Sequence, residues 1–458
     1  MKSYTFKGLL TENGWLENIT VSVDEKGTIT NIAETESVNS EIVNGFALPG
    51  FQNAHSHAFQ YAMAGLAEMH QTGQTADDFW SWRTTMYNLA LTISPDDFEA
   101  IASMLYAEMV QNGYTDVAEF HYLHHNKTGL PYSNLAEMGE RLMRAAEKTG
   151  IHLTLVPIFY QKGGFGTAAT ENQKRFISPD FEAYQELVKA SEKVATNYKN
   201  TNIGLGIHSL RAVDEESIKK TATFLQANQP MHIHVSEQLK EIEDCLDFYG
   251  KRPVEWLLDT VDLNDNWHLV HATHLNSHEL NGIAKHKANV VLCPSTEGNL
   301  GDGIFRLTEF QKQNGNWSIG TDSHIGINPF EELRLLDYGQ RLISHKRNTF
   351  VTDNSGNSGF NAIKMAWKSG RKAMGKSNDT FFKIGEPFDA VVIDSKLPLI
   401  QATKTEHLCN TIVYTGHSSS ILGTIINGDW KAKHGKHLAL DHIIKDYKKT
   451  MEVLAVRL

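Results

Sequence analysis

Two histidines one residue apart, His55 and His57, follow an apolar run that ends in Pro49 and Gly50. Successive side chains of a β-strand point to opposite faces, so residues i and i+2 share a face. Both imidazoles can therefore point to one position from the end of a single strand, as two ligands of a divalent metal do. Taken alone the pair is ambiguous, because two exposed loop histidines would give the same pattern.

Two more residues could complete a metal site. His234 lies in the segment HIHVSEQ, and Asp322 lies in GTDSH. Three histidines, one carboxylate and a water would suit one zinc or a similar divalent ion, and zinc lowers the pKa of its water to about 7. Asp322 could also accept the proton of that water. The alternative for Asp322 is the N-cap of a helix after the eighth strand.

Two further residues could move protons. Glu237 lies three residues after His234, from where it could reach a substrate atom beside the metal without binding the metal. Its alternative is a surface glutamate that opens the next helix. His271, at the end of the sixth strand, could polarise or protonate the attacked group. A two-metal site would need a bridging group such as a carbamylated lysine, but the fourth strand ends in His208, so we expect one metal.

Two arginines on predicted loops, Arg83 and Arg211, indicate a substrate with anionic groups, because guanidinium binds carboxylate through two hydrogen bonds. Arg83 lies in the aromatic segment DDFWSWRTTMY. The alternative is that Trp80, Trp82 and Arg83 pack on the outside of the molecule. The candidate substrate-binding residues are Gln60, Arg83, Tyr122, His208 and Arg211.

The elements that must position these residues alternate along the chain. Eight apolar runs separated by helical stretches predict an α/β fold with a (β/α)8 barrel over residues 49–376. His, Asp or Glu stands at the C-terminal end of six of these runs, where packing alone would favour Val, Ile and Leu. Barrel enzymes carry their active sites at that end. The glycine-rich segment 163–180 is predicted to be a long loop over the barrel mouth.

Both ends of the chain show strand and hairpin patterns. Residues 1–48 contain a hairpin signal at 25–27, and residues 377–436 contain the strong turn pair Asn427-Gly428. We expect the two ends to build one small β-sandwich domain, with the catalytic domain inserted between them and a C-terminal helix over 437–458. In the barrel, Ser94, Pro95 and Gly113 delimit a predicted helix.

Composition excludes several classes of partner. The chain has 458 residues, 41% hydrophobic content and a formal net charge of −11. The acidic balance argues against nucleic acid or an anionic membrane as partner. No stretch approaches the roughly 20 apolar residues of a membrane span, and the N-terminus lacks the apolar core of a signal peptide. Three scattered cysteines form no disulfide pattern, so we expect a cytoplasmic protein.

The motifs HSH, HIHVSEQ, LVHATH and GTDSH resemble those of the deaminase branch of the amidohydrolase superfamily. Within that branch the chain resembles the formimidoylglutamate deiminase family of bacterial histidine degradation. Stretches such as HSHAF, AEFHY, HSLRAV and EELRLLDYGQR carry this resemblance along nearly the whole chain. The departures are modest: Tyr61, Pro294 and the loop HIGINPF after Asp322 differ from the family pattern, and none removes a ligand.

The resemblance implies one divalent metal, preferably Zn²⁺, and hydrolysis of N-formimidoyl-L-glutamate to N-formyl-L-glutamate and ammonia by a homodimer. It implies metal ligands His55, His57, His234 and Asp322, catalytic residues Glu237, His271 and Asp322, and the five substrate-binding residues named above. Another deaminase, acting on an aromatic base such as guanine or cytosine, is the alternative. A non-catalytic barrel is a remote alternative, because such proteins usually lose metal ligands.

Overall fold

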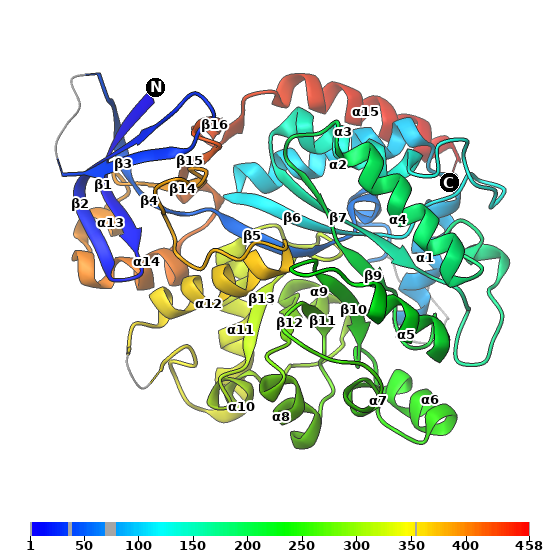
Figure 1. Ribbon diagram of the computed structural model, residues 1–458. Helices are drawn as coiled ribbons and strands as arrows, with labels where there is room; N and C mark the ends of the chain where they lie inside the picture. Colours follow the sequence, from blue (N-terminus) through cyan, green and yellow to red (C-terminus); the bar gives the residue numbers. More distant parts are fainter. Residues whose placement is uncertain (1, 35–38, 69–78, 353–354, 458) are drawn as a thin grey trace.

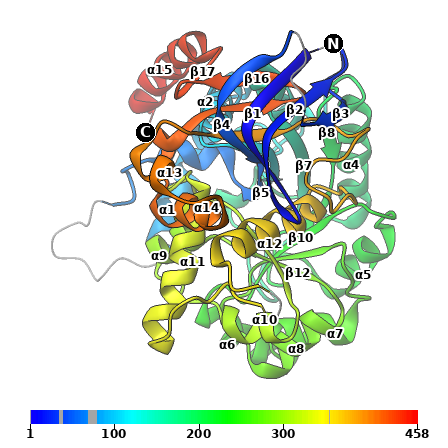
Figure 2. The ribbon, with the colours of Figure 1, turned by 90° about the vertical axis from the view of Figure 1, so that its left-hand side faces the viewer.

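A barrel built from the middle of the chain lies beside a β-sheet built from its two ends (Figure 1). The computed structural model describes residues 2–34, 39–68, 79–352 and 355–457. In a view turned by 90°, the sheet of the chain ends lies above the barrel (Figure 2). Within the described residues, no helix is both long and apolar enough to cross a membrane.

Among the described residues the barrel contains eight parallel strands, and each overlaps one of the predicted apolar runs, so the predicted (β/α)8 fold is confirmed. Several strands, such as β6 and β10, are buried along their whole length, as parallel strands covered on both faces should be. A short extra strand, β8 (Thr201–Ile203), pairs with β7. In order around the barrel the strands are β5 (Phe51–Ser56), β6 (Tyr114–His121), β7 (His152–Phe159), β9 (Leu205–Ile207), β10 (Met231–Val235), β11 (Trp267–His271), β12 (Asn289–Leu292) and β13 (Asn316–Ile319).

The first and last barrel strands meet at what we call the closing seam, which consists of the C-terminal end of β5 and the residues just after β13. The carbonyl oxygen of His55 accepts the N–H groups of Thr321 (3.1 Å) and Asp322 (3.0 Å). The carbonyl oxygen of Asp322 accepts the N–H of His57 at 3.1 Å, and Ser56 pairs with Asp322 as a parallel bridge. Three predicted metal ligands are therefore joined through their own main chain.

Helices follow the strands around the barrel. The predicted helix after the first strand begins at its Ser94 N-cap with Pro95 in the first turn, and Gly113 follows its end with φ +89°. The helices of this part are α1 (Phe79–Thr92), α2 (Pro95–Gln111), α3 (Glu137–Thr149), α4 (Phe181–Ala195), α5 (Glu215–Phe224), α6 (Leu239–Tyr249), α7 (Pro253–Thr260), α8 (Ser277–Lys285), α9 (Pro294–Leu300), α10 (Leu307–Lys312), α11 (Pro329–Ser344) and α12 (Ser358–Ala373).

The two chain ends combine in one domain as expected, and hydrogen bonds link its eight described strands into one mixed sheet. The N-terminal and C-terminal parts join where β4 runs antiparallel to β14. The predicted domain boundaries remain predictions. In spatial order the strands are β17 (Lys436–His437), β16 (Asp429–Lys433), β15 (Ile421–Ile426), β14 (Ala390–Asp394), β4 (Glu41–Pro49), β1 (Lys2–Thr11), β2 (Gly14–Val23) and β3 (Ile29–Ala33).

Both predicted hairpin turns form, and they touch. Asn427 and Gly428 have φ values of +50° and +68°, as the two central residues of a type I′ turn require. Gly27, in the turn between β2 and β3, also has positive φ, and a Cβ there would lie 1.8 Å from the Asn427 carbonyl oxygen. A glycine is therefore needed at position 27 for both backbone conformation and space.

In its described residues the C-terminal part contributes the α-helices α13 (Pro398–Ala402), α14 (Leu408–Thr415) and α15 (Leu440–Arg457). The last of these lies along α2 and α3 on the outside of the barrel (Figure 1). It is held there by ion pairs between Arg457 and Asp97 (2.5 Å) and between Asp446 and Lys148 (2.9 Å).

A buried charge network closes the N-terminal end of the barrel. Asp116, at 1% exposure near the start of β6, pairs with Lys376 and accepts a hydrogen bond from Gln52 Nε2 at 3.1 Å. His152 at the start of β7 contacts Asp389 (Nε2–Oδ2 3.2 Å). Burial alone would raise the pKa of Asp116, but Lys376 and His152 lower it to about 2. The carboxylate is therefore charged at neutral pH.

Lys376→Met should lower the free energy of unfolding by about 3–5 kcal/mol, because it leaves Asp116 buried without its cation. The contribution of Asp116 is complete above its unfolded pKa of about 3.9 and is lost as pH falls toward its folded pKa. The stability gap between wild type and variant should therefore narrow between pH 4 and pH 2. Urea unfolding across this range measures both effects.

Lys372→Met is the matched control, since Lys372 lies four residues earlier, in the last turn of α12, and pairs with the exposed Asp265 at 3.1 Å. An exposed pair contributes less than about 1 kcal/mol. Equal losses in the two variants would contradict the role assigned to the buried pair.

Candidate metal centre and active site

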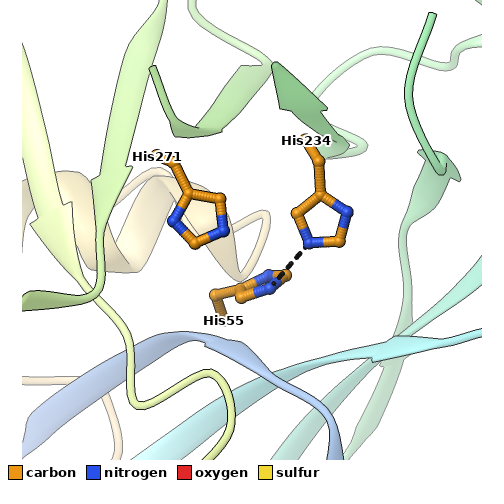
Figure 3. A group of neighbouring side chains, drawn as sticks. All are labelled: His55, His234 and His271. Carbon is orange, nitrogen blue, oxygen red and sulfur yellow. Dashed lines mark hydrogen bonds between the residues drawn. The ribbon is translucent and has the colours of Figure 1, made fainter. Parts of the chain in front are cut away.

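Four side chains predicted as metal ligands converge at the C-terminal end of the barrel strands. His55 Nε2 lies 3.0 Å from His234 Nε2 and 3.1 Å from His57 Nε2. Asp322 Oδ1 lies 3.4 Å from His55 Nε2 and 3.3 Å from His57 Nε2. Figure 3 shows the rings of His55, His234 and His271, from three different strands, facing one another.

The hydrogen bonds behind these rings decide what the facing atoms can bind. His57 Nδ1 lies 3.0 Å from the Phe120 carbonyl oxygen, and His234 Nδ1 lies 3.1 Å from that of His208. A carbonyl oxygen only accepts, so each Nδ1 carries the proton and each neutral Nε2 presents a lone pair to the centre. Lone pairs and a carboxylate that point at one position fit a divalent cation.

The charge states of these groups also fit a divalent cation. Burial lowers the pKa of His55 to about 3 and also lowers the pKa values of His57 and His234, so all three imidazoles are neutral at pH 7. Burial would raise the pKa of Asp322, but contacts with His55 and His271 hold it below its usual range. Neutral imidazoles and an ionised carboxylate are the forms that bind metal. Asp322 caps no helix, since Asn328 is the N-cap of α11.

Glu237 and His271 adjoin the centre from β10 and β11. His271 Nε2 lies 3.7 Å from Glu237 Oε1 and 3.6 Å from Asp322 Oδ2, and its Nδ1 lies 3.2 Å from Glu297 Oε1. Burial would lower the pKa of His271, but Glu237 and Glu297 raise it to about 10. Burial raises the pKa of Glu237 to about 7. At neutral pH the protein groups alone thus form an imidazolium beside a carboxyl that can gain or lose a proton.

The backbone turns sharply where the strands deliver these residues. Ser236, His271, Ala272 and Asp322 all have positive φ, between +47° and +66°. This left-handed conformation is unfavourable for residues other than glycine, costs on the order of 1–3 kcal/mol each, and clusters at functional sites. Three strand ends therefore share the same strained geometry around one point.

A small cavity lies above the centre and opens to solvent at its mouth. Every predicted site residue lines it except His55, which is fully buried beneath. Glu237 is 6% exposed, so it is no surface glutamate. Helix α1 forms one wall with Phe79, Trp82, Arg83, Met86 and Tyr87, so Trp82 and Arg83 face the cavity and not the outside.

Polar contacts arrange the predicted substrate-binding side chains. Gln60 Nε2 donates a hydrogen bond to the Tyr122 hydroxyl at 3.1 Å. The Arg83 Cζ atom lies 5.4 Å from the centroid of the Tyr87 ring. Arg211 Nη1 lies 3.8 Å from Glu241 Oε2. Both arginines line the cavity that also contains the candidate metal centre.

An amidohydrolase family model matches residues 46–431 of the chain. The chain belongs to the amidohydrolase family. This amidohydrolase is 40% identical to a formimidoylglutamate deiminase from Pseudomonas aeruginosa, over 94% of each chain. The crystal structure of an amidohydrolase from Brucella melitensis superposes with a TM-score of 0.93 at 39% identity, covering 99% of this chain and 100% of that one.

A more distant structure shares the fold. An adenosine deaminase from Xanthomonas campestris with bound zinc is 17% identical, with a TM-score of 0.82 over 99% of this chain and 98% of that one. At that identity the likeness shows the fold alone.

The segment 163–180 of this amidohydrolase is firmly anchored over its second half. Arg175 is fully buried, donates to the Ala90 and Ile93 carbonyl oxygens at the end of α1, and donates to the His125 carbonyl oxygen. Gln173 donates to the Tyr160 hydroxyl at 2.7 Å. The segment therefore supports the helix that carries Arg83.

Among the buried glutamates that the sequence interpretation did not single out, three hold residues of the candidate centre or their neighbours. Glu297 contacts His271, Glu241 accepts the N–H groups of Ser236 (3.0 Å) and Glu237 (3.1 Å), and Glu119 lies on β6. Glu241 and Glu297 lie in the first turns of α6 and α9, where acidic residues are ordinary helix signals. The only feature of the sequence that could have singled out Glu119 is its charge inside the apolar run of β6.

Proposed function

We propose that this amidohydrolase hydrolyses N-formimidoyl-L-glutamate to N-formyl-L-glutamate and ammonia, using one divalent metal ion, preferably zinc, in histidine degradation. The observation that carries the proposal is that Arg83 and Arg211 share one cavity with the His and Asp centre and with Glu237. The similarity to a formimidoylglutamate deiminase over 94% of the chain supports the same substrate.

The charge distribution in the cavity matches the two ends of this substrate. The formimidoyl group is a cationic amidine, and the cavity offers it the ionised carboxylate of Asp322 beside Glu237, whose carboxyl can gain or lose a proton. The glutamate part carries two carboxylates, and the two guanidinium groups can bind them through paired hydrogen bonds. Binding both ends fixes the formimidoyl carbon beside the centre.

His55, His57, His234 and Asp322 would hold the metal, which lowers the pKa of a water toward neutrality when bound. Asp322 accepts a proton as the oxygen of water bonds to the formimidoyl carbon. Glu237 takes the remaining proton of that oxygen and transfers it to the terminal nitrogen, His271 donates a hydrogen bond to the reacting group, and Asp322 returns its proton to solvent. The carbon–nitrogen bond then breaks, ammonia leaves, and the oxygen forms the formyl carbonyl.

An assay of ammonia release separates this proposal from deamination of an aromatic base. Purified enzyme is given N-formimidoyl-L-glutamate in parallel with guanine, adenosine and cytosine. Activity on the glutamate derivative alone is expected, because a base needs edge-reading groups in place of paired arginines. Activity confined to a base would contradict the proposal.

We also infer a cytoplasmic homodimer. The cysteines Cys245, Cys293 and Cys409 are free and buried, which suits a reducing compartment. The homodimer rests on the family resemblance, and light scattering after size-exclusion chromatography tests it.

Arg83→Met and Arg211→Met should each raise KM about 10–100-fold, because each removes charged hydrogen bonds of about 1.5–3 kcal/mol to a substrate carboxylate. Neither arginine is a proposed ligand, so metal content should not change. Steady-state kinetics and metal analysis measure the two quantities.

Arg306→Met is the matched control, since Arg306 pairs with Glu309 on α10 and does not line the cavity. Loss of metal in the Arg83 or Arg211 variant, or an equal rise of KM in the control, would contradict the assigned roles.

A further inference from the structure

A single buried carboxylate, that of Glu119, binds the residues on both sides of the proposed metal ligand His57. Glu119 is 1% exposed on β6. Its Oε2 accepts a hydrogen bond from Ser56 Oγ at 2.6 Å, and its Oε1 accepts the N–H of Ala58 at 2.5 Å. Both bonds span about sixty positions of sequence, from the end of the first barrel strand to the second.

Glu119 lies behind the candidate metal centre and does not line the cavity above it. Its Oε2 also accepts the Tyr106 hydroxyl of α2 at 3.1 Å, so the carboxylate lies between the barrel and its outer helix. It cannot touch a substrate in the cavity, and any effect on the reaction must pass through the residues that it holds.

The neighbour of Glu119 holds the same histidine from another side. The Phe120 carbonyl oxygen accepts the proton of His57 Nδ1 at 3.0 Å, and the Asp322 carbonyl oxygen accepts the main-chain N–H of His57 at 3.1 Å. With Ser56 and Ala58 fixed on Glu119, the backbone and the ring of His57 are both constrained. Its Nε2 is therefore aimed at the centre before any ligand binds.

We infer that Glu119 is a positioning residue for the divalent metal, acting through Ser56 and Ala58 on the direction of His57. The inference rests on the metal centre of the proposed function. Groups that orient metal ligands typically contribute about 10–100-fold to metal affinity.

The alternative is that Glu119 only satisfies buried donors. The chain offers a matched residue for this alternative. Glu332 is fully buried on α11 and accepts both the Ser295 N–H (3.0 Å) and the Ser295 hydroxyl (2.5 Å). It thus makes the same two kinds of bond to a residue in the first turn of α9, whose neighbours in the chain include no proposed metal ligand.

The test measures zinc binding directly, by competition with a chromophoric chelator on metal-free full-length protein, together with thermal unfolding. Glu119→Met removes both acceptors at similar volume and should weaken zinc binding about 10–100-fold. Glu119→Gln keeps an acceptor for Ala58 and a donor for Ser56, and should recover most of the affinity. Glu332→Met should lower stability and leave zinc affinity unchanged.

A milder variant keeps the test decisive where Glu119→Met fails to fold. Ser56→Ala deletes only the hydroxyl bond and should weaken zinc binding by less than Glu119→Met, with the chain still folded. Unchanged zinc affinity in the folded Glu119 or Ser56 variants, or an equal loss in Glu332→Met, would overturn the inference. Wild-type protein that binds zinc without deiminating the glutamate derivative would overturn only the proposed substrate. Wild-type protein that binds no zinc would overturn both.

Discussion

Glu237→Gln should lower kcat about 10²–10⁴-fold, the range that a positioned acid–base group supplies. The amide has the size of the carboxyl but cannot carry a proton from water to the departing nitrogen. Glu237 approaches His271 at 3.7 Å and is no member of the converging ligand set, so metal content should stay the same. The substrate-binding arginines are also untouched, so KM should change little.

Steady-state kinetics and metal analysis on the same preparation test this expectation. Glu243→Gln is the matched control, because Glu243 lies on the exposed side of α6, six residues further along the chain. A variant that keeps wild-type kcat, or one that loses its metal, would contradict the role of Glu237 as the proton carrier.

Removal of the metal by a chelator should reduce turnover to background, and added Zn²⁺ should restore it. Without the ion the attacking water keeps its ordinary pKa of about 15.7, so little hydroxide is available at neutral pH. The melting temperature should rise with zinc, since binding at 100 times Kd stabilises the folded state by about 2.7 kcal/mol. Turnover that survives complete removal of divalent metal would refute the proposed chemistry.

Two variants on one strand sharpen this experiment. His234→Asn should prevent reconstitution, because it removes a ligand. His232→Asn is the control: His232 shares β10 but contacts the Ala373 carbonyl oxygen at 3.0 Å, away from the centre. It should still bind one metal per chain, even where stability falls. Loss of zinc in both variants would show that any substitution on β10 disrupts the site. His57→Asn, on a different strand, would then test the ligand set.

The architecture could be predicted from the sequence because the patterns that specify it involve residues close together in the chain. Alternation of apolar runs and helices predicts the barrel, and the Ser94 and Asn427-Gly428 patterns predict their cap and turn from a few neighbouring residues. The candidate site also followed, because the C-terminal ends of parallel strands meet at one edge. His55, His57, His234 and Asp322 therefore come together although 267 positions separate the first from the last.

What the sequence could not predict depends on distant partners. Glu119 resembles any charged residue until its bonds to Ser56 and Ala58 are seen. Arg175 lies in a polar segment that looks like a free loop, and only its three carbonyl partners reveal an anchor. Strand patterns specify pairing partners weakly, so the pairing of β4 with β14, which joins the two chain ends in one sheet, could not be read from the sequence.

The closing seam has a consequence for how the protein matures in the cell. During synthesis His55 and His57 leave the ribosome long before Asp322, and the hydrogen bonds that join them form only when the last barrel strand pairs with the first. A nascent chain that ends before Asp322 lacks a complete ligand set. The proposed metal therefore binds late, after the barrel has closed. A nascent chain on a ribosome stalled before residue 322 should bind no zinc at this site.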